Sequence, residues 1–386
     1  MKIISIEARA IDRGFQNQVL QTTRVASPMS RFPRFGEKRA SWMWPTKKVF
    51  VRVTAEDGTS GWSCTNGGEI VAMIINDHLS RLLTGEPLDD IATLWDQMFF
   101  SLLPCDRSGF SMMAISGVDI ALWDLAAKTQ NQSLVEMLGG TAQPTLPVYI
   151  TTPQPEVHGA AGWSGLKAAA PFGPETGKVG LDANVTYMRQ FRDVAGPDVP
   201  IMIDAFMAWD AEYTLQFLDA ARDLNLHWVE DPIPPYDIEG MQRIKAEMDG
   251  SISLALGNFA FSRWDCADLL REGLVDILQP DVAWAGGISE TLRILDMADT
   301  ADVPVILHNT CEQPWALALA AARQTDALVE FVDRGAESQL YGLTGPPAIF
   351  EQGRVTIPQD IKGNRPQPDV EQQFAPAIAG AHKEAR

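Results

Sequence analysis

Seven polar residues recur at the ends of short apolar runs, and their types are suited to metal binding and proton transfer. They are Lys167, Asp204, Glu230, Asn258, Asp281, His308 and Glu330. From Asp204 onward, neighbouring members are 22 to 28 residues apart, about the length of one strand plus one helix. An Asp at the end of a single strand is more often a helix cap. The repeated spacing, rather than any one residue, therefore predicts a shared site.

Three of these positions predict a metal site. Asp204 and Glu230 offer hard oxygen ligands of the kind that Mg²⁺ prefers. Asn258 is third in the row, and its carbonyl oxygen can coordinate a hard cation without adding charge. We therefore expect Mg²⁺ as the cofactor, with Asp204, Glu230 and Asn258 as its ligands.

The remaining positions predict acid–base chemistry. Asp281 and His308 are placed to form a dyad, in which the carboxylate fixes the imidazole tautomer and raises its basicity. Glu330 is a candidate hydrogen-bond donor to developing negative charge, provided that its surroundings keep it protonated. Lys167 adds a cation on the far side. With a divalent metal, these residues suit removal of a proton α to a carboxylate, because the resulting enediolate has two adjacent negative oxygens.

Eight short apolar runs predict the strands that carry these residues. The runs are LPVYIT, WSGLKAA, VPIMIDAF, LHWVEDP, ISLALGN, VDILQPDV, VPVILHNT and ALVEFVD. Helical patterns separate most of them, and strands buried on both faces are continuously apolar. This alternation favours an α/β fold, a parallel (β/α)₈ barrel that places its chemistry at the C-terminal ends of its strands.

The first part of the chain has a different pattern. Strand-like runs cover residues 3–10 and 48–55, and Asp57-Gly58 is a hairpin signal. A long polar stretch with prolines lies between the runs, which is typical of a functional lid. Helical patterns follow up to about residue 140. The C-terminal tail is too short for another strand–helix unit, so we expect it to return to this first α+β region.

Composition excludes several classes of protein. The formal net charge is −19 and no basic cluster occurs, which argues against nucleic acid and membrane surfaces as partners. The four cysteines include no CxxC pair, so neither a zinc site nor a disulfide framework is indicated. The N-terminus lacks the apolar core of a signal peptide, and we expect no apolar run long enough to span a membrane. A cytoplasmic protein is the expectation.

Several motifs together resemble one known family. They are ASPMSRF, TNGGE, GVDIALWDLAAK, GLKAAAPFGPETG, IDAFMAWD, WVEDPIPP and ILQPDVAWAGGISE, followed by the strand that ends in His308. In order and spacing they are similar to the enolase superfamily, mandelate racemase subgroup, and most of all to L-rhamnonate dehydratase and related acid-sugar dehydratases. The resemblance implies a capping domain over residues 1–145, joined by 341–386, and a modified TIM barrel over residues 146–340.

The resemblance also implies a reaction. A Mg²⁺-dependent dehydratase of this kind abstracts the C2 proton of a sugar acid and eliminates the C3 hydroxyl, giving a 2-keto-3-deoxy acid. His308 with Asp281 would be the base and acid, and Glu330 would lie opposite. The implied partner is a small-molecule aldonate such as L-rhamnonate, L-lyxonate or L-mannonate. A homo-oligomer is also implied, because members of this superfamily often form dimers to octamers.

Three positions depart from the family pattern. The third metal ligand is normally glutamate, where this chain has Asn258, and rhamnonate dehydratases follow it with histidine, where this chain has Phe259. Their lid histidine aligns with Gln18. We therefore expect Gln18 and Phe259 to contact the substrate, together with Arg24 and Arg31 of the lid as donors to a polyhydroxy acid.

Two alternatives follow from these departures. One is a catalytically silent, acid-sugar-binding homologue with a weakened metal site. The other is a racemase or epimerase of the same superfamily, which needs a second base. Racemases carry that base in a Lys-x-Lys motif, and here Gly165 replaces its first lysine, which favours dehydration.

Overall fold

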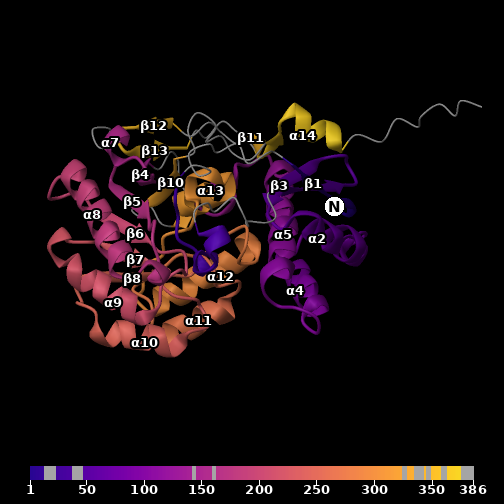
Figure 1. Cartoon of the computed structure of the whole chain (residues 1–386). Coiled ribbons are helices and arrows are strands. Elements are labelled where there is room, and N and C mark those ends of the chain that lie inside the picture. The colour runs from indigo at the N-terminus through magenta and orange to yellow at the C-terminus, as the bar shows by residue number, and fades with distance from the viewer. Residues whose placement is uncertain are drawn as a thin grey trace, which may run out of the picture.

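The computed structural model describes residues 1–12, 23–36, 47–140, 145–158, 162–323, 328–333, 343–344, 349–357 and 363–374. Figure 1 shows two lobes, one of helices and antiparallel strands near the N-terminus and one in which helices surround a sheet. The fold has an N-terminal capping region and a C-terminal α/β barrel, as the sequence predicts.

The capping region is a three-stranded antiparallel sheet covered by helices. Its strands β1 (Ile3–Ile11), β2 (Lys48–Ala55) and β3 (Ser60–Thr65) lie in chain order, and the predicted turn at Asp57-Gly58 joins the last two. Its helical segments are α2 (Gly68–Met73), a π-helical segment (Ile74–Leu79), α3 (Ser80–Leu83), α4 (Ile91–Leu102), α5 (Gly109–Thr129) and α6 (Leu134–Met137). The apolar face of the sheet packs on α5.

Helix α5 is the core helix of this lobe. It is long and apolar enough to cross a membrane by length and composition alone, contrary to the expectation from the sequence. However, 83% of that window is buried inside the protein, as in the core helix of a soluble protein. Buried Asp119 on α5 accepts hydrogen bonds from the backbone N–H and the hydroxyl of Ser289 on the barrel side, so the same helix joins the two lobes.

The barrel sheet runs in parallel through β4, β5, β6, β7, β8 and β9, and β10 pairs with β4. The bounds are β4 (Thr145–Thr151), β5 (Gly165–Ala169), β6 (Ile201–Asp204), β7 (Trp228–Glu230), β8 (Ser253–Leu256), β9 (Ile277–Leu278) and β10 (Val329–Val332). The predicted run VPVILHNT is not a strand but a single bridge between Val305 and Leu278. Pro304 has no backbone N–H to donate, and Asn309 turns left-handed at φ 52°, which ends the run early.

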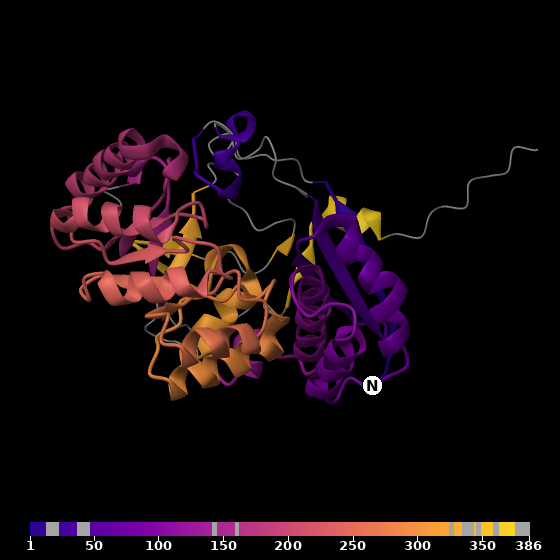
Figure 2. The same ribbon diagram turned by 60° about the horizontal axis from the view of Figure 1, so that its bottom comes forward.

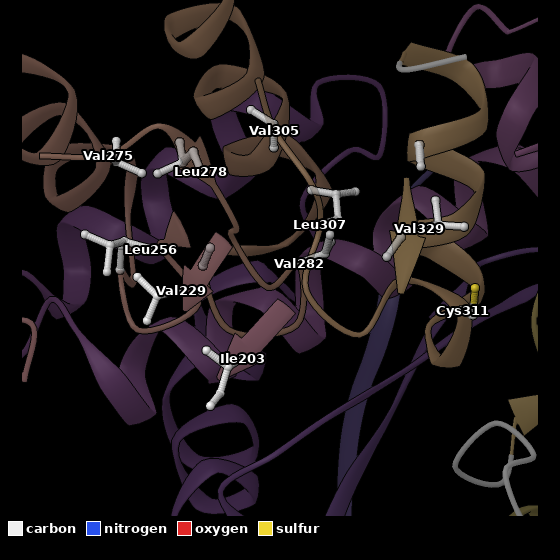
Figure 3. Close-up of a cluster of buried hydrophobic side chains, with 14 of the residues drawn as sticks. Ile203, Val229, Leu256, Val275, Leu278, Val282, Val305, Leu307, Cys311 and Val329 are labelled. Atoms are coloured by element: carbon white, nitrogen blue, oxygen red, sulfur yellow. The ribbon is translucent and has the colours of Figure 1, made fainter. Parts of the chain in front are cut away.

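Helices surround this sheet on the outside (Figure 1). They are α7 (Pro155–His158), α8 (Gly177–Ala195), α9 (Ala211–Ala220), α10 (Ile238–Glu247), α11 (Arg263–Arg271), α12 (Gly287–Thr300) and α13 (Pro314–Arg323). Ile203, Val229, Leu256, Leu278 and Val329 come from successive strands and form the apolar cluster in Figure 3.

The alternation of side chains along each strand sets the direction of the polar residues. A second buried cluster comprises Tyr149, Met202, Trp228, Ala255, Ile277 and Ile306. Two residues after Met202 and Trp228 stand Asp204 and Glu230, which therefore share their face and the barrel interior. The strand ends thus carry acidic groups above an apolar floor.

The tail contacts both lobes. The hairpin of β12 (Ile349–Glu351) and β13 (Arg354–Thr356) extends the barrel sheet at β4, whereas β11 (Leu343–Thr344) pairs with β14 (Arg365–Pro366). Asn364 donates to Asp124 Oδ1 at 2.7 Å and to the Trp62 carbonyl at 2.9 Å in the capping lobe. Phe374, just after α14 (Pro368–Gln373), packs edge-on against Trp62. The boundaries at 145/146 and 340/341 stay predictions.

The described part of the lid contains two short 3₁₀ turns, Pro28–Arg31 and Pro33–Phe35. In Figure 2 this indigo segment lies beside the barrel lobe. The backbone N–H of Ala26 donates to the Ala170 carbonyl at 2.7 Å, which anchors the lid beyond the C-terminal end of β5.

Candidate active site

Three carboxylates meet at the ends of β6 and β7. Among the described residues, Asp204, Glu230 and Asp231 form a group whose ligand atoms all lie within 4.8 Å of one another. The first two were predicted from the sequence, but Asp231 was not. The third predicted ligand, Asn258, is buried, and its side chain acts to lower the pKa of the neighbouring Asp231 carboxyl. The acidic group therefore contains the third negative charge that Asn258 does not provide.

Two oxygen atoms at this group lack hydrogen-bond donors among the described residues, although Glu230 and Asp204 have donors of their own. Within the described part of the chain, buried Asp231 Oδ2 and Asn258 Oδ1 accept no hydrogen bond. Burial, and then the charges of Glu230 and Asp204, hold the pKa of Asp231 well above its usual range. Buried oxygens without donors and with crowded negative charge need a cation. The donor set therefore fits a hard divalent metal ion.

A left-handed backbone conformation explains how the Asp231 side chain reaches Asp204 and Glu230. Side chains of consecutive strand residues point to opposite faces, so a Glu-Asp pair is not expected to share a site. Asp231 leaves the strand with φ 40°. Gly257 before Asn258 has φ 133°, and a Cβ there would lie 2.8 Å from the Gln279 backbone nitrogen. Such conformations cluster where function requires them.

Lys167 lies between two carboxylates. Its Nζ is 2.8 Å from Glu230 Oε1, Glu230 Oε2 and Glu330 Oε1, and its side chain is 1% exposed. Burial alone would lower the pKa of Lys167, but the charges of Glu230 and Glu330 raise it well above the usual value. Lys167 is thus a buried ammonium ion that links the ends of three strands.

Glu330 does not meet the condition set for its predicted role. Burial would raise its pKa, but the charges of Lys167 and His308 and the hydrogen bonds from Lys167 and Thr151 lower it to about 2. It accepts hydrogen bonds from Thr151 Oγ1 at 2.6 Å and from the Asn309 backbone N–H at 2.8 Å. Glu330 is therefore ionised, and the expectation of a protonated donor is wrong.

Asp281 and His308 form the predicted pair. His308 Nδ1 lies 2.8 Å from Asp281 Oδ2. Burial alone would lower the pKa of His308, but the hydrogen bond with Asp281 and the charges of Glu330 and Asp281 outweigh it, so the pKa is raised. With Nδ1–H donated to the carboxylate, Nε2 carries the lone pair and is the basic atom.

An aromatic row connects the third ligand position to this pair. The ring of Phe259 contacts Phe206 at 5.7 Å and Trp284 at 6.0 Å, and Trp284 lies 5.4 Å from the His308 ring. Phe259 is partly exposed at the mouth of the barrel. It offers an apolar surface, in contrast to a hydrogen-bonding histidine.

The lid residues differ in their placement. Arg24 donates from Nε to the Pro171 carbonyl at 3.2 Å and stacks over Phe172 at 4.7 Å, beside the barrel mouth. Arg31 is exposed on its 3₁₀ turn. Gln18 lies outside the described residues. Sequence reasoning also missed Gln313, whose amide donates to Asp281 Oδ1 at 3.0 Å.

Comparison with known proteins agrees with this architecture. The enolase C-terminal domain-like family model matches residues 155–363, and the mandelate racemase/muconate lactonizing enzyme N-terminal domain model matches residues 42–139. The chain belongs to the enolase superfamily. Within it, the protein is a member of the mandelate racemase/muconate lactonizing enzyme family.

Members of this family that resemble the chain include acid-sugar dehydratases, which are hydro-lyases. An L-rhamnonate dehydratase from Saccharopolyspora erythraea is 32% identical over 354 residues, 90% of each chain. The structure of rhamnonate dehydratase from Gibberella zeae complexed with Mg has 28% identity and a TM-score of 0.86, covering 96% of this chain and 95% of that one. L-talarate/galactarate dehydratase from Salmonella typhimurium LT2, at 22% identity, TM-score 0.75 and 96% and 90% coverage, has the same fold.

Proposed function

We propose that this protein is a Mg²⁺-dependent dehydratase of a sugar acid, an aldonate such as L-rhamnonate, L-lyxonate or L-mannonate. The observation that carries the proposal is the His308–Asp281 pair at 2.8 Å, on the same rim as three converging carboxylates. The dehydratase relatives and the Mg-complexed structure support it.

Proton transfer falls to His308. Nε2 takes the C2 proton, while Asp281 holds Nδ1–H and stabilises the imidazolium that forms. The imidazolium then protonates the C3 hydroxyl as the C3–O bond breaks and a C2–C3 double bond forms. Water leaves with that proton, and the enol tautomerises to a 2-keto-3-deoxy acid. One residue thus acts as base and then as acid.

Asp204, Glu230 and Asp231 would hold Mg²⁺, with Asn258 as a neutral fourth group. When bound, the ion would stabilise the two adjacent negative oxygens of the enediolate. Lys167 supports this arrangement, because its ammonium group donates to both carboxylate oxygens of Glu230 and so orients that side chain.

The environment of Lys167 favours elimination over racemisation. Racemisation needs a base on each face of the substrate, and all three short contacts of the Lys167 ammonium go to carboxylate oxygens. No proton acceptor is therefore available at this position. His308 alone supplies the base, which is sufficient for removal of one proton and departure of the neighbouring hydroxyl.

A substrate screen tests the proposal. Purified protein with Mg²⁺ is incubated with a library of aldonates and aldarates, and 2-keto-3-deoxy acids are detected as products. We expect turnover of at least one aldonate, loss of turnover with EDTA, and loss in His308→Asn with the fold intact. A protein that binds Mg²⁺ but releases no product from any acid would instead be a silent homologue. An epimer formed without loss of water would identify an epimerase.

A further inference from the structure

The Asp281 carboxylate is held from two sides. Oδ2 faces His308 Nδ1, whereas Oδ1 accepts hydrogen bonds from the Ala283 backbone N–H at 2.8 Å and from Gln313 Nε2 at 3.0 Å. Ala283 follows on the same loop as Asp281, so its bond is local. Gln313 comes from the other side of His308 in the chain, between the 3₁₀ turn Thr310–Glu312 and α13. Of the two donors to Oδ1, Gln313 is the one that reaches Asp281 from a different loop.

The orientation of the Gln313 amide is determined by a second contact. Trp315 Nε1 donates to Gln313 Oε1 at 2.8 Å. An indole N–H can only donate, so it selects the amide oxygen and leaves the NH₂ group directed at Asp281. Both side chains are buried, at 4% and 2% exposure, so water cannot replace either partner freely. The amide therefore cannot flip without losing both hydrogen bonds.

The backbone at Gln313 is also constrained. Pro314 restricts the preceding residue to extended conformations, and Gln313 has φ −116° and ψ 104°. Its carbonyl accepts from the Leu317 N–H at 2.9 Å, and its own N–H donates to the Thr310 carbonyl at 3.2 Å. Backbone, side-chain oxygen and side-chain nitrogen are thus each held by a separate partner.

We propose that Gln313, locked by the Trp315 indole, is a positioning residue that holds the Asp281 carboxylate in the orientation that receives His308 Nδ1–H. It acts on the reaction through the dyad and touches neither substrate nor metal. The inference rests on the proposed function in one respect, because turnover is one of its readouts. Its other readout, the tautomer and titration of His308, needs no substrate.

Two variants test it in the full-length protein. Gln313→Met removes the donor and keeps the length of the side chain, and Gln313→Glu keeps an acceptor for Trp315 but places a second carboxylate beside Asp281. Gln216→Met is the matched control, because Gln216 is exposed and its amide donates to Glu212 on the same helix, far along the chain from the dyad. The other charged groups facing His308, namely Glu330 and Lys167, are unchanged in all three.

The expected results follow from the geometry. In Gln313→Met, kcat falls about tenfold with KM little changed, as for other supporting hydrogen bonds to active groups. The Nδ1–H tautomer of His308, measured by ¹⁵N NMR with His308→Asn for assignment, becomes less populated. In Gln313→Glu, the His308 titration midpoint moves to higher pH. Gln216→Met changes none of these.

A structural role alone gives a different outcome. If folded Gln313→Met and Gln313→Glu keep the wild-type tautomer and titration of His308, the proposal is overturned, whatever their activity. If Gln313→Met does not fold, the titration of His308 in Gln313→Glu decides whether the proposal holds. If the wild-type protein turns over no acid, the dehydratase proposal fails, while the NMR result still decides whether Gln313 positions the dyad.

Discussion

At the scale of single residues, Asp231 and Asn258 lie beside each other at the candidate metal site. In the proposed metal site, Asn258 would supply a neutral oxygen at the usual third carboxylate position, and Asp231 would supply the charge from the neighbouring strand end. Both have a buried oxygen that accepts no hydrogen bond from the described residues. Two adjacent acceptors without donors are best explained by a bound cation.

The proposed ligand set predicts opposite effects of two substitutions. Asp231→Asn should raise the Kd for Mg²⁺ by about tenfold or more, because affinity for hard cations follows ligand charge. Asn258→Asp should lower the Kd. Isothermal titration calorimetry measures both, with Asp198→Asn, an exposed carboxylate in another loop, as the control. An unchanged Kd in Asp231→Asn would exclude Asp231 from the metal site.

The pKa of His308 predicts the pH dependence. A histidine must be neutral to act as a general base, and the hydrogen bond to Asp281 with the charges of Glu330 and Asp281 raises the pKa of His308 above 6.5. Activity should therefore be low at acidic pH and rise as pH passes through that raised pKa. Asp281→Asn should lower kcat and move the acidic limb of kcat/KM to lower pH. If the limb stays in place, another group controls it.

At the scale of elements, a buried lysine joins the ends of the barrel strands. Lys167 on β5 bridges Glu230 on β7 and Glu330 on β10, and Thr151 on β4 bonds the same Glu330. An ammonium ion that satisfies two buried carboxylates keeps both from being unpaired charges. The network therefore contributes to closing the barrel where β10 returns to β4.

Removal of this cation has a predictable cost. Lys167→Met should lower the free energy of unfolding by about 3–5 kcal/mol in metal-free buffer, because it leaves buried carboxylates uncompensated. Lys178→Met is a matched control, since Lys178 pairs with Asp182 on the exposed face of α8 and should change stability by less than about 1 kcal/mol. Urea denaturation measures both. Equal effects of the two substitutions would contradict a structural role for the buried network.

At the scale of the whole molecule, ion binding at the candidate metal site should be linked to folding. The ligand side chains come from separate strand ends that converge only in the folded barrel, so Mg²⁺ should bind the native state in preference to the unfolded chain. At a concentration one hundred times Kd, the ion should add about 2.7 kcal/mol of stability and raise Tm. Differential scanning fluorimetry with Mg²⁺ and with EDTA measures the shift. Asp204→Asn should reduce it, and a Tm independent of Mg²⁺ would count against the site.

The architecture and most of the polar residues at the strand ends could be predicted from the amino-acid pattern. Apolar runs separated by helical patterns predict the barrel, and their period predicts that Asp204, Glu230, Asp281, His308 and Glu330 share one end. The physical reason is that parallel strands with connecting helices put equivalent ends on one side. The same pattern failed for VPVILHNT, where a proline and a left-handed turn leave only a bridge.

The charges of these residues and the neighbours that complete the site follow from the folded structure. Asp231 enters the site because its backbone turns left-handed after β7, which strand periodicity cannot show. Glu330 is ionised because Lys167 arrives from β5, on a distant part of the chain. Gln313 reaches Asp281 across two loops. Protonation and orientation depend on partners brought together by folding, whereas the order of the strand ends depends on local pattern alone.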